Sequence, residues 1–365
     1  MARLKEYNGH YCESEYEYAF IGFLEAEGWI YTSGNNIRRV TKRDVLIADD
    51  FKKFIADTNP ELIEEEVTQI YDNVRLVGSE SDFATLHKVY GWMVNGVQFT
   101  PQDGQPRMIP LIDFNNWDKN IFRVVNQFTV EYTNNGQKEN RRPDVLLFVN
   151  GMPLCVVELK NPADANATIY DAWEQINIRY WRDIPHLLHY CPLACISDGV
   201  KTRLGTVRTP YEHFYAWRRV NEGDVVSTLP FAETETMIKG VYTPERFVEI
   251  FRDYIYFQDS IYDSDEREIV CRYPQFFATR LLKQSIIKSV VEKSGKGGTY
   301  FGATGCGKTY TMAFLARQLA LRCTDIPEIG SPTIILIVDR DELQKQGSKL
   351  FTKSKEFLNL GEVSV

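Results

Sequence analysis

Two apolar runs joined by an Asn-Gly pair constrain the fold of this chain more than any other feature. The runs are VLLFVN and LCVVELK, and Asn150-Gly151 joins them. Short apolar runs separated by an Asn-Gly turn are typical of a β-hairpin. The length of both runs indicates that this hairpin lies in a core. We therefore expect an α/β fold in which helices flank a mixed central sheet.

The rest of the chain alternates between helical and extended patterns. Helical spacing of apolar residues predicts helices over 13–27, 48–57, 60–76, 79–93, 167–181, 244–256, 275–293 and 308–322, with a Pro in the first turn of the third. Extended patterns predict strands over 122–132, 193–199, 299–304 and 333–339, and NNGQKENRR supplies turn residues. The polar stretch 258–268 is the expected linker.

A chain of 365 residues is long enough for two domains with separate cores. We expect a first domain over 1–245, a connecting helix and linker over 246–270, and a second domain over 271–365. No run approaches the roughly 18 apolar residues of a membrane span, and the start lacks a secretory signal. These features predict a cytoplasmic protein without membrane contact. The seven cysteines show no CxxC pairing, which predicts reduced, mostly buried thiols.

The net charge of −8 disfavours a general nucleic-acid coat, because binding to phosphates rewards clustered Lys and Arg. Any contact with DNA should therefore be local. The first domain shows no evident basic groove in its sequence, which predicts that it captures DNA poorly by itself.

Three charged residues lie at the margins of the hairpin. Asp144 precedes the first run, and Glu158 and Lys160 close the second. Carboxylates are ligands suited to Mg²⁺, which assists phosphodiester hydrolysis by neutralising charge and activating water. Lys160 shares a side of its strand with Glu158, because side chains alternate with period two. The alternative is a strand pair with solvated charges at its ends.

These residues match the PD-(D/E)xK nuclease pattern. Their wider context resembles the nuclease domain of type I restriction R subunits, in RPDVLLFVNGMPLCVVELKNP, ISDGVKTRLGT, PYEHFYAWR and DRDELQKQ. The resemblance implies that Asp144, Glu158 and Lys160 form the metal and catalytic set, with Asp144 and Glu158 as Mg²⁺ ligands. It also implies an accessory acid on the first helix, Glu17, with Glu13 or Glu15 as alternatives.

The family carries a glutamine and a tyrosine four residues apart on the helix after the lysine, and this chain departs from that spacing. Gln175 is followed four residues later by Arg179, and Tyr180 comes one residue further on. Either Arg179 replaces the tyrosine or the helix register slips. Gln175 and Tyr180 are the expected site residues, and a polar helix face is the alternative for Tyr180.

A phosphate-binding loop opens the second domain. The segment GATGCGKT fits GxxxxGK[ST], between a short apolar run and a predicted helix. Its backbone amides and the helix N-terminus favour phosphate, Lys308 reaches the β and γ phosphates, and Thr309 ligates Mg²⁺. The predicted ATP-binding residues of this loop are Gly302, Thr304, Gly305, Cys306, Gly307, Lys308 and Thr309.

The second domain resembles a partial RecA-like domain of a superfamily 2 helicase-like motor. By that resemblance Gln275 reads adenine, although a surface glutamine at a helix start is the alternative, and Asp339 and Arg340 lie near the DNA path. The sequence ends at Val365 without a Walker B acid or a second lobe. We therefore expect a fragment of a longer protein that hydrolyses no ATP by itself.

The combined expectation is a DNA-cleaving, ATP-dependent translocating subunit of a type I restriction system. Its expected cofactors are Mg²⁺ and ATP, and its expected partners are double-stranded DNA and the methylation and specificity subunits. A stand-alone P-loop ATPase with a partner-binding front domain is one alternative. A type III-like or solitary helicase-nuclease is another.

Overall fold

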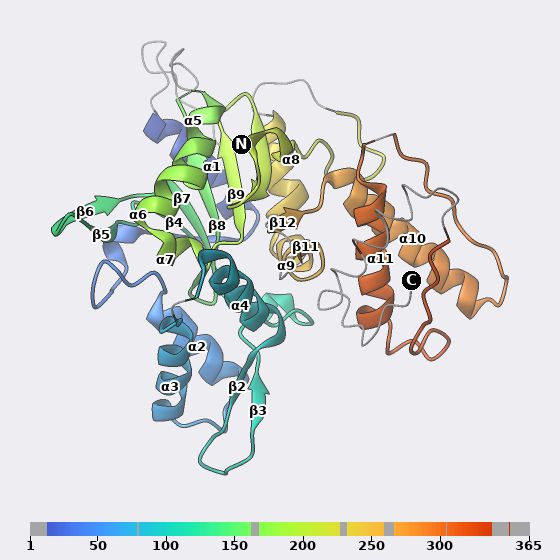
Figure 1. Cartoon of the computed structure of the whole chain (residues 1–365), viewed down its shortest axis with the longest axis horizontal. Coiled ribbons are helices and arrows are strands. Elements are labelled where there is room, and N and C mark those ends of the chain that lie inside the picture. The colour runs from blue at the N-terminus through green and yellow to red at the C-terminus, as the bar shows by residue number, and fades with distance from the viewer. Residues whose placement is uncertain are drawn as a thin grey trace. The chain divides into compact units, whose positions relative to one another are not determined.

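The computed structural model describes residues 13–78, 80–161, 168–226, 232–258, 266–303 and 305–337, together with Leu350 (Figure 1). The chain divides into two compact units, Met1–Val248 and Glu249–Val365. Among the described helices, none combines the length and the apolar character that crossing a lipid bilayer requires.

A six-stranded sheet forms the centre of the first unit. Its strands, in spatial order, are β1 (Ile30–Ser33), β4 (Phe122–Asn126), β7 (Val145–Val149), β8 (Met152–Leu159), β9 (Leu193–Ser197) and β10 (Thr202–Thr206). β1 runs parallel to β4 and β8 parallel to β9, whereas β4/β7, β7/β8 and β9/β10 are antiparallel. The prediction of an α/β fold with a mixed central sheet is therefore confirmed.

The predicted hairpin forms the middle of this sheet. Every residue of β7 and β8 is buried, which explains why both segments are almost uniformly apolar. Asn150 and Gly151 make the turn with φ of 50° and 75°. A Cβ on Gly151 would lie 2.2 Å from the carbonyl oxygen of Ile47. The turn therefore needs glycine both for its backbone conformation and for the close approach of the chain before α2 (Ala48–Thr58).

Helices cover both faces of the sheet. The register of β8 and β9 pairs Leu159 with Ser197 and Glu158 with Ile196, so Ser197 and Glu158 point to opposite faces. Tyr16 of α1 (Glu13–Ala26) hydrogen-bonds Ser197 at 2.6 Å, and Tyr180 contacts Glu158. One face is therefore covered by α1 and α8 (Ala232–Val241). The other is covered by α5 (Ile169–Glu174), the π-helix Gln175–Tyr180 and α6 (Trp181–Asp183).

Smaller elements surround this centre. The helices are α3 (Glu64–Arg75), α4 (Asp82–Asn95), α7 (Pro185–Leu188) and α9 (Pro244–Asp253), with 3₁₀ turns at Gly34–Asn36, Trp117–Lys119 and Tyr211–His213. Two antiparallel ribbons project from it, β2 (Val97–Phe99) with β3 (Arg107–Ile109), and β5 (Val130–Asn134) with β6 (Gln137–Arg141).

Two of the differences from the sequence prediction in the first unit have a local cause. The third predicted helix begins at Glu64 rather than near Pro60, because the Glu66 carboxylate accepts the Ile63 N–H at 3.0 Å and starts the helix there. The strand predicted over 122–132 is two strands, β4 and β5. Gln127 between them has a φ of 56°, which breaks the extended conformation.

The segment expected to contain turn residues, NNGQKENRR, is only partly a turn. Asn135 and Gly136 make the turn with positive φ, and the following residues form β6, paired with β5. Polar residues are accommodated in β6 because most of its side chains face solvent.

The second unit contains a ribbon and two long helices in its described part. The ribbon pairs β11 (Ile255–Gln258) with β12 (Arg267–Val270), and the helices are α10 (Tyr273–Val291) and α11 (Lys308–Arg322). The ends of the expected linker 258–268 are therefore paired strands, whereas 259–265 lie outside the described residues. The ribbon also ends the helix predicted over 244–256, which stops at Asp253.

Two strands predicted in the second unit are absent from its described residues. Residues 299–303 and 333–337 have no strand structure, and Phe301, Ile335 and Ile337 are largely exposed. An apolar strand of this kind is stable when neighbouring strands pair with its backbone and helices cover it. The described part of this unit offers no such neighbours, since β11 and β12 pair with each other.

The described cysteines are free thiols, as the absence of CxxC spacing predicted. Cys155, Cys191, Cys195, Cys271 and Cys323 are buried and Cys306 is partly exposed. Cys12 lies outside the described residues. Burial raises the pKa of the Cys155 and Cys191 thiols well above the ordinary value, which makes these thiols unreactive.

Candidate active site

The ends of β7 and β8 bring two carboxylates together. Asp144 immediately precedes β7 and Glu158 is the penultimate residue of β8. The Asp144 carboxylate accepts the backbone N–H of Leu159 at 2.7 Å, and the Asp144 N–H lies 3.4 Å from Oε1 of Glu158. The antiparallel pairing of β7 with β8 therefore fixes the two acids beside each other.

Glu158 is fully buried, and only one of its carboxylate oxygens is hydrogen-bonded within the described structure. Oε1 accepts the Tyr180 hydroxyl at 2.5 Å, whereas Oε2 is buried without a hydrogen-bond partner. Burial, and secondly the charge of Asp144, raise the pKa of Glu158 well above its ordinary value. A buried carboxylate oxygen that accepts no hydrogen bond is costly, so this oxygen is suited to bind a cation in addition to its charge contact with Lys160.

Lys160 lies at the same site, as its spacing from Glu158 predicted. Its backbone N–H is held by Ser197 O at 2.8 Å, which extends the β8/β9 pairing by one residue. Its ammonium donates to Oε1 of Gln175 at 3.0 Å and lies 3.9 Å from Oε2 of Glu158. The longer distance to Glu158 indicates a charge contact rather than a hydrogen bond.

A π-helix explains the unusual spacing of Gln175 and Tyr180. Residues Gln175–Tyr180 form a π-helical segment between α5 and α6, in which residues five apart, rather than four, face the same side. Gln175 Nε2 donates to the Tyr180 hydroxyl at 2.8 Å. Arg179 instead points to solvent and pairs with Glu174 at 2.7 Å. Of the two alternatives left by the sequence, the structure brings Tyr180 to Glu158 and leaves Arg179 outside.

Glu17 lies on the other face of the sheet. It is buried on α1, and its Oε1 accepts Nδ2 of Asn126 at 2.6 Å. Asn126 pairs with Val145, which pairs with Val157, so by strand alternation it points away from the Glu158 side. The structure therefore gives Glu17 a partner on β4 and shows no bond from it to Asp144, Glu158 or Lys160.

The sequence also left Glu13 and Glu15 of the first helix as alternative acids. Glu15 is one residue from Tyr16 and is partly exposed, and the side chain of Glu13 lies outside the described residues. Sequence reasoning missed Asn126 as the partner of Glu17. The only available signal was its position as a polar residue in an otherwise apolar strand pattern.

The donor set of the site is small. Among the described residues, no group of three or more His, Cys, Asp or Glu side chains is arranged to hold a metal ion. Asp144 and Glu158 supply two carboxylates, and Mg²⁺ commonly uses one or two carboxylates and keeps several waters. The buried, unpartnered Oε2 of Glu158 is the observation that fits such a cation.

The phosphate-loop residues of the second unit precede α11. Gly307 has a left-handed conformation, with φ of 81°, and the helix begins at Lys308. The Lys308 ammonium donates to the carbonyl oxygens of Gly302 at 2.7 Å and Ala303 at 3.1 Å. Thr309 lies in the first helical turn and Thr304 lies outside the described residues, as do Asp339 and Arg340. The Lys308 side chain therefore contacts backbone carbonyls at the start of its own loop.

Gln275 contacts this loop directly. It is buried in the first turn of α10, and its Nε2 donates to Gly307 O at 3.1 Å and Cys306 O at 3.3 Å. Its Oε1 accepts the Arg272 N–H at 2.8 Å. The alternative of a surface glutamine is therefore wrong. Both ends of the amide are occupied by backbone groups, and the role of Gln275 in reading adenine stays a prediction.

The fold and the strand-end site define a mixed α/β unit with a carboxylate and lysine centre, followed by a unit with a phosphate-loop motif. The family model "Type I restriction enzyme R protein N terminus" matches residues 11–213, and the chain belongs to this family. A second family model, "SWI2/SNF2 ATPase", matches residues 274–362.

Several curated relatives are similar to most of this chain. It is 29% identical to the putative type I restriction enzyme MjaIXP endonuclease subunit of Methanocaldococcus jannaschii, over 92% of this chain and 34% of that protein. It is 28% identical to the type I restriction enzyme HindI endonuclease subunit of Haemophilus influenzae, over 95% of this chain and 33% of that protein. The chain thus spans about one third of the length of these relatives.

Proposed function

We propose that this chain carries the DNA-cleaving site of a type I restriction enzyme and that the site hydrolyses phosphodiesters with a divalent cation. The observation that carries the proposal is the buried Glu158 beside Asp144. Its Oε2 accepts no hydrogen bond in the described structure and lies 3.9 Å from the Lys160 ammonium. The names of the curated relatives, which are endonuclease subunits, support the same reading.

Asp144 and Glu158 would hold Mg²⁺ in this proposal. When bound, the cation supplies charge neutralisation at the phosphate and lowers the pKa of a bound water. Tyr180 donates to Oε1 of Glu158, which would leave Oε2 available to ligate the cation. Asp144 is kept in place by the Leu159 N–H. The chain thus orients both carboxylates through neighbouring groups before a cation binds.

Lys160 is the residue that we propose stabilises negative charge in the transition state. Its ammonium can donate to a non-bridging phosphate oxygen as negative charge develops in the transition state. Gln175 holds the ammonium through its Oε1, and Tyr180 holds Gln175. This relay from Tyr180 to Lys160 restricts the rotamers of a long, flexible side chain.

The second unit would bind ATP at its phosphate loop as part of a DNA-translocating motor. The GxxxxGK[ST] motif, the N-terminus of α11 and the match to the SWI2/SNF2 ATPase family support this role. Lys308 would exchange its loop carbonyls for the β and γ phosphates, and Thr309 would ligate Mg²⁺. Double-stranded DNA is the proposed substrate, and methylation and specificity subunits are the proposed partners.

Cleavage and metal binding test the nuclease proposal together. Asp144→Asn and Lys160→Ala should each reduce Mg²⁺-dependent nicking of supercoiled plasmid by at least about 100-fold, because each removes a group that acts on the transition state. In titration calorimetry with Mn²⁺, Asp144→Asn should lose binding, whereas Lys160→Ala should keep it.

Glu174→Gln is the matched control, since Glu174 ends α5 and, among the described residues, pairs with the exposed Arg179. It should leave nicking and Mn²⁺ binding unchanged. If Asp144→Asn binds Mn²⁺ with the parental affinity, Asp144 is not a metal ligand and the proposed site is wrong. A parental chain that binds metal but never nicks DNA, alone or with its partner subunits, would favour a binding module instead.

A further inference from the structure

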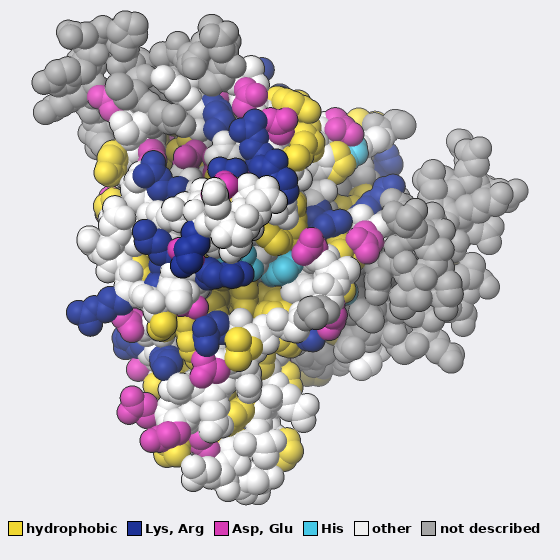
Figure 2. Space-filling model, turned by 60° about the vertical axis from the view of Figure 1, so that its left-hand side comes forward, with side chains coloured by type: hydrophobic (Ala, Val, Ile, Leu, Met, Phe, Trp, Pro, Cys, Tyr) yellow, Lys and Arg dark blue, Asp and Glu magenta, His cyan; other side chains and the backbone are white. Residues whose placement is uncertain are grey.

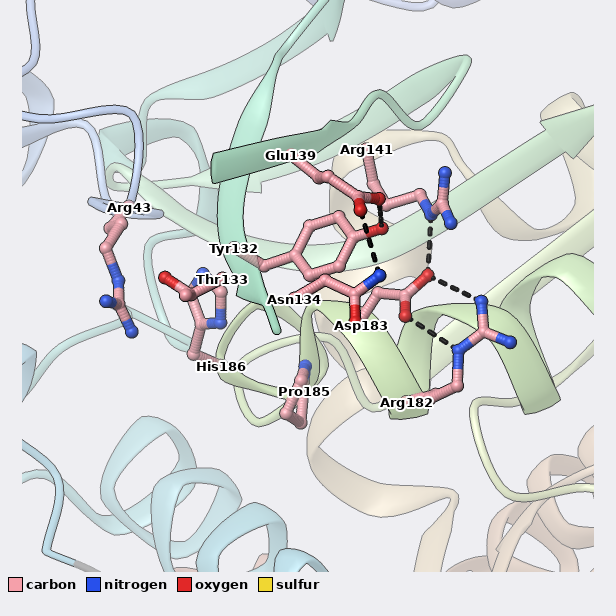
Figure 3. A pocket seen from close by; sticks show the side chains of 10 residues that line it. All are labelled: Arg43, Tyr132, Thr133, Asn134, Glu139, Arg141, Arg182, Asp183, Pro185 and His186. Carbon is pink, nitrogen blue, oxygen red and sulfur yellow. Dashed lines mark hydrogen bonds and ion pairs between the residues drawn. The ribbon is translucent and has the colours of Figure 1, made fainter. Parts of the chain in front are cut away.

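A polar pocket of about 590 Å³ is lined in part by residues that are close in sequence to the candidate active site (Figure 3). We call it the arginine pocket. It is formed by the β5/β6 ribbon, the segment before α2 and the junction of α6 with α7. Its charged and titratable lining residues are Arg43, Arg141, Arg182, Glu139, Asp183 and His186.

Asp183 fixes two of the three guanidinium groups. This buried carboxylate accepts Arg141 Nε at 2.7 Å, Arg182 Nε at 2.7 Å and Arg182 Nη2 at 2.9 Å. The contacts with Arg182, and secondly Arg141, hold the pKa of Asp183 below its usual range despite partial burial. Figure 3 shows the terminal nitrogens of Arg141 pointing away from Asp183. Guanidinium groups held through one edge keep their other N–H donors for a ligand.

The second carboxylate of the pocket is also occupied. Glu139 accepts the Tyr132 hydroxyl at 2.6 Å and Asn134 Nδ2 at 2.8 Å. Both carboxylates therefore accept hydrogen bonds from within the pocket. The lining keeps three guanidinium charges against two carboxylates, and its remaining donors favour an anion.

His186 contributes a second, independent observation at this pocket. Its Nε2 is buried and has no hydrogen-bond partner in the described structure. Burial, and secondly the charge of Arg43, lower the pKa of His186 to about 4, so its imidazole is neutral near pH 7. Buried polar atoms in proteins are usually paired, which makes this nitrogen available to an incoming polar group.

The arginine pocket and the candidate active site share two chain segments. Arg141 precedes Asp144 by three residues, and Arg182 follows Tyr180 by two. An extended chain spans at most about 3.6 Å per residue, so both arginines begin within roughly 11 Å of a site residue. Duplex DNA carries one charge per about 1.7 Å of helix axis. Several phosphates of a duplex bound at the site therefore lie within reach of this pocket.

The surrounding surface is basic although the whole chain is acidic. Figure 2, which turns the side with β5, β6, α6 and α7 forward, shows Lys and Arg side chains gathered on this face. Arg142 is exposed between the pocket and Asp144, and Lys138 of the ribbon is 77% exposed. The sequence shows no evident basic groove in the first domain, because a net charge of −8 averages over both faces and does not reveal a local cluster of basic side chains.

We propose that the arginine pocket binds backbone phosphates of duplex DNA and positions the duplex across the candidate active site. This inference rests on the proposed nuclease function and adds the surface on which the substrate lies. Arg43 and Arg182 contact phosphate oxygens through their free N–H groups, and Asp183 is a positioning residue for Arg141 and Arg182. The contacts are to the backbone and carry no base specificity.

DNA binding in the presence of EDTA tests this proposal separately from cleavage. The affinity of the 365-residue chain for a labelled duplex is measured by fluorescence anisotropy over a series of NaCl concentrations. The double variant Arg43→Gln/Arg182→Gln should weaken binding at least about tenfold. It should also reduce the slope of log K against log[salt] by roughly 2, because each lost phosphate contact removes about 0.9.

A second pocket of the same unit supplies the matched control. It is about 330 Å³ in volume and is also lined by three basic and two acidic side chains: Arg218, Arg219, Lys239, Asp224 and Glu235. It is built on α8, on the sheet face opposite Glu158. The double variant Arg218→Gln/Lys239→Gln removes the same charge and should leave both affinity and slope unchanged.

Several outcomes would overturn the proposal. It fails if the parental chain does not bind duplex DNA, if the arginine-pocket variant keeps the parental slope, or if the control variant weakens binding equally. It also fails if the arginine-pocket variant loses affinity for inorganic phosphate but keeps the parental affinity for duplex DNA, since the pocket would then be a site for free phosphate. If the chain binds DNA normally but never cleaves it, the proposed nuclease function is contradicted. The proposal that the arginine pocket binds DNA would still hold.

Discussion

Glu158 shows how a proposed metal ligand can weaken the fold that holds it. Its type and position follow from the sequence, but its burial, its contact with Tyr180 and its unpartnered Oε2 come from tertiary packing. Without a bound cation, a buried carboxylate beside Asp144 favours its protonated form. The site therefore stores an electrostatic cost that cation binding would relieve.

We predict that Glu158→Gln stabilises the metal-free protein near neutral pH by roughly 1–3 kcal/mol. The native state holds the proton of Glu158 more tightly than the unfolded chain does, because its pKa is raised. Stability is therefore lost as pH rises above about 4.3, the ordinary pKa of glutamate. The variant lacks this ionisation, so its advantage should grow with pH. Urea unfolding in EDTA from pH 5 to 8 measures it.

Asp50→Asn is the control for this prediction, with the opposite expected sign. Asp50 is also a buried carboxylate, but both of its oxygens accept from Arg123, at 2.6 and 2.8 Å. Its replacement leaves a guanidinium partly unpaired and should destabilise the protein by about 1 kcal/mol or more. A loss of stability in Glu158→Gln as large as in Asp50→Asn would show that the Glu158 charge is already compensated.

At the scale of elements, the sequence predicted the hairpin, the strand-end residues and the helix after them, but it left the register of that helix open. Asn150-Gly151, two apolar runs and the period of two determine which side chains meet at the ends of β7 and β8. The pairing of Gln175 with Tyr180 depends on a π-helix, which no local pattern in QINIRY indicates. The position of Glu17 depends on which sheet face α1 covers, and sequence alone does not determine that.

We predict that deletion of Arg179 preserves the candidate site. A π-helical turn accommodates one extra residue locally, so its removal should restore an α-helix in which Gln175 and the tyrosine are four residues apart. The tyrosine should then still contact Glu158, because residues four apart share a helix face. Mn²⁺ affinity, measured by calorimetry, should stay within about threefold of the parent.

An insertion of one alanine after Arg179 is the matched control, because the π-helix cannot accommodate a second extra residue in the same turn. It should rotate the Tyr180 hydroxyl away from Glu158 and lower Mn²⁺ affinity about 10- to 100-fold, the usual cost of losing a residue that orients a ligand. Circular dichroism checks that both variants fold. Equal loss of affinity in both would mean that this segment has no defined register.

At the scale of the whole molecule, the secondary structure of the first unit was easier to predict from the sequence than that of the second. The first unit contains its own six-stranded sheet, and its architecture follows from patterns within the chain. The apolar runs 299–303 and 333–337 of the second unit have no strand partners among its described residues. Their pattern is typical of buried strands, but both strand predictions fail for the described residues, where no neighbouring strand pairs with these runs.

Coupling between the units gives the last prediction, for the assembly with methylation and specificity subunits. Lys308→Ala should abolish ATP hydrolysis and linearisation of circular DNA, because it removes the proposed contact with the β and γ phosphates. Lys160→Ala should abolish linearisation and leave ATP hydrolysis and DNA movement intact. Phosphate release, triplex displacement and plasmid linearisation are measured for both variants.

The arginine pocket adds an expectation for DNA binding by the Lys308→Ala variant. If the first unit binds duplex DNA by its own basic face, Lys308→Ala should still bind the plasmid with the parental salt dependence and fail only to cut it. The motor then supplies the trigger for cleavage rather than the affinity for DNA. Linearisation by Lys308→Ala at the parental rate would show that the two units act independently. Loss of plasmid binding in this variant would instead assign DNA capture to the motor.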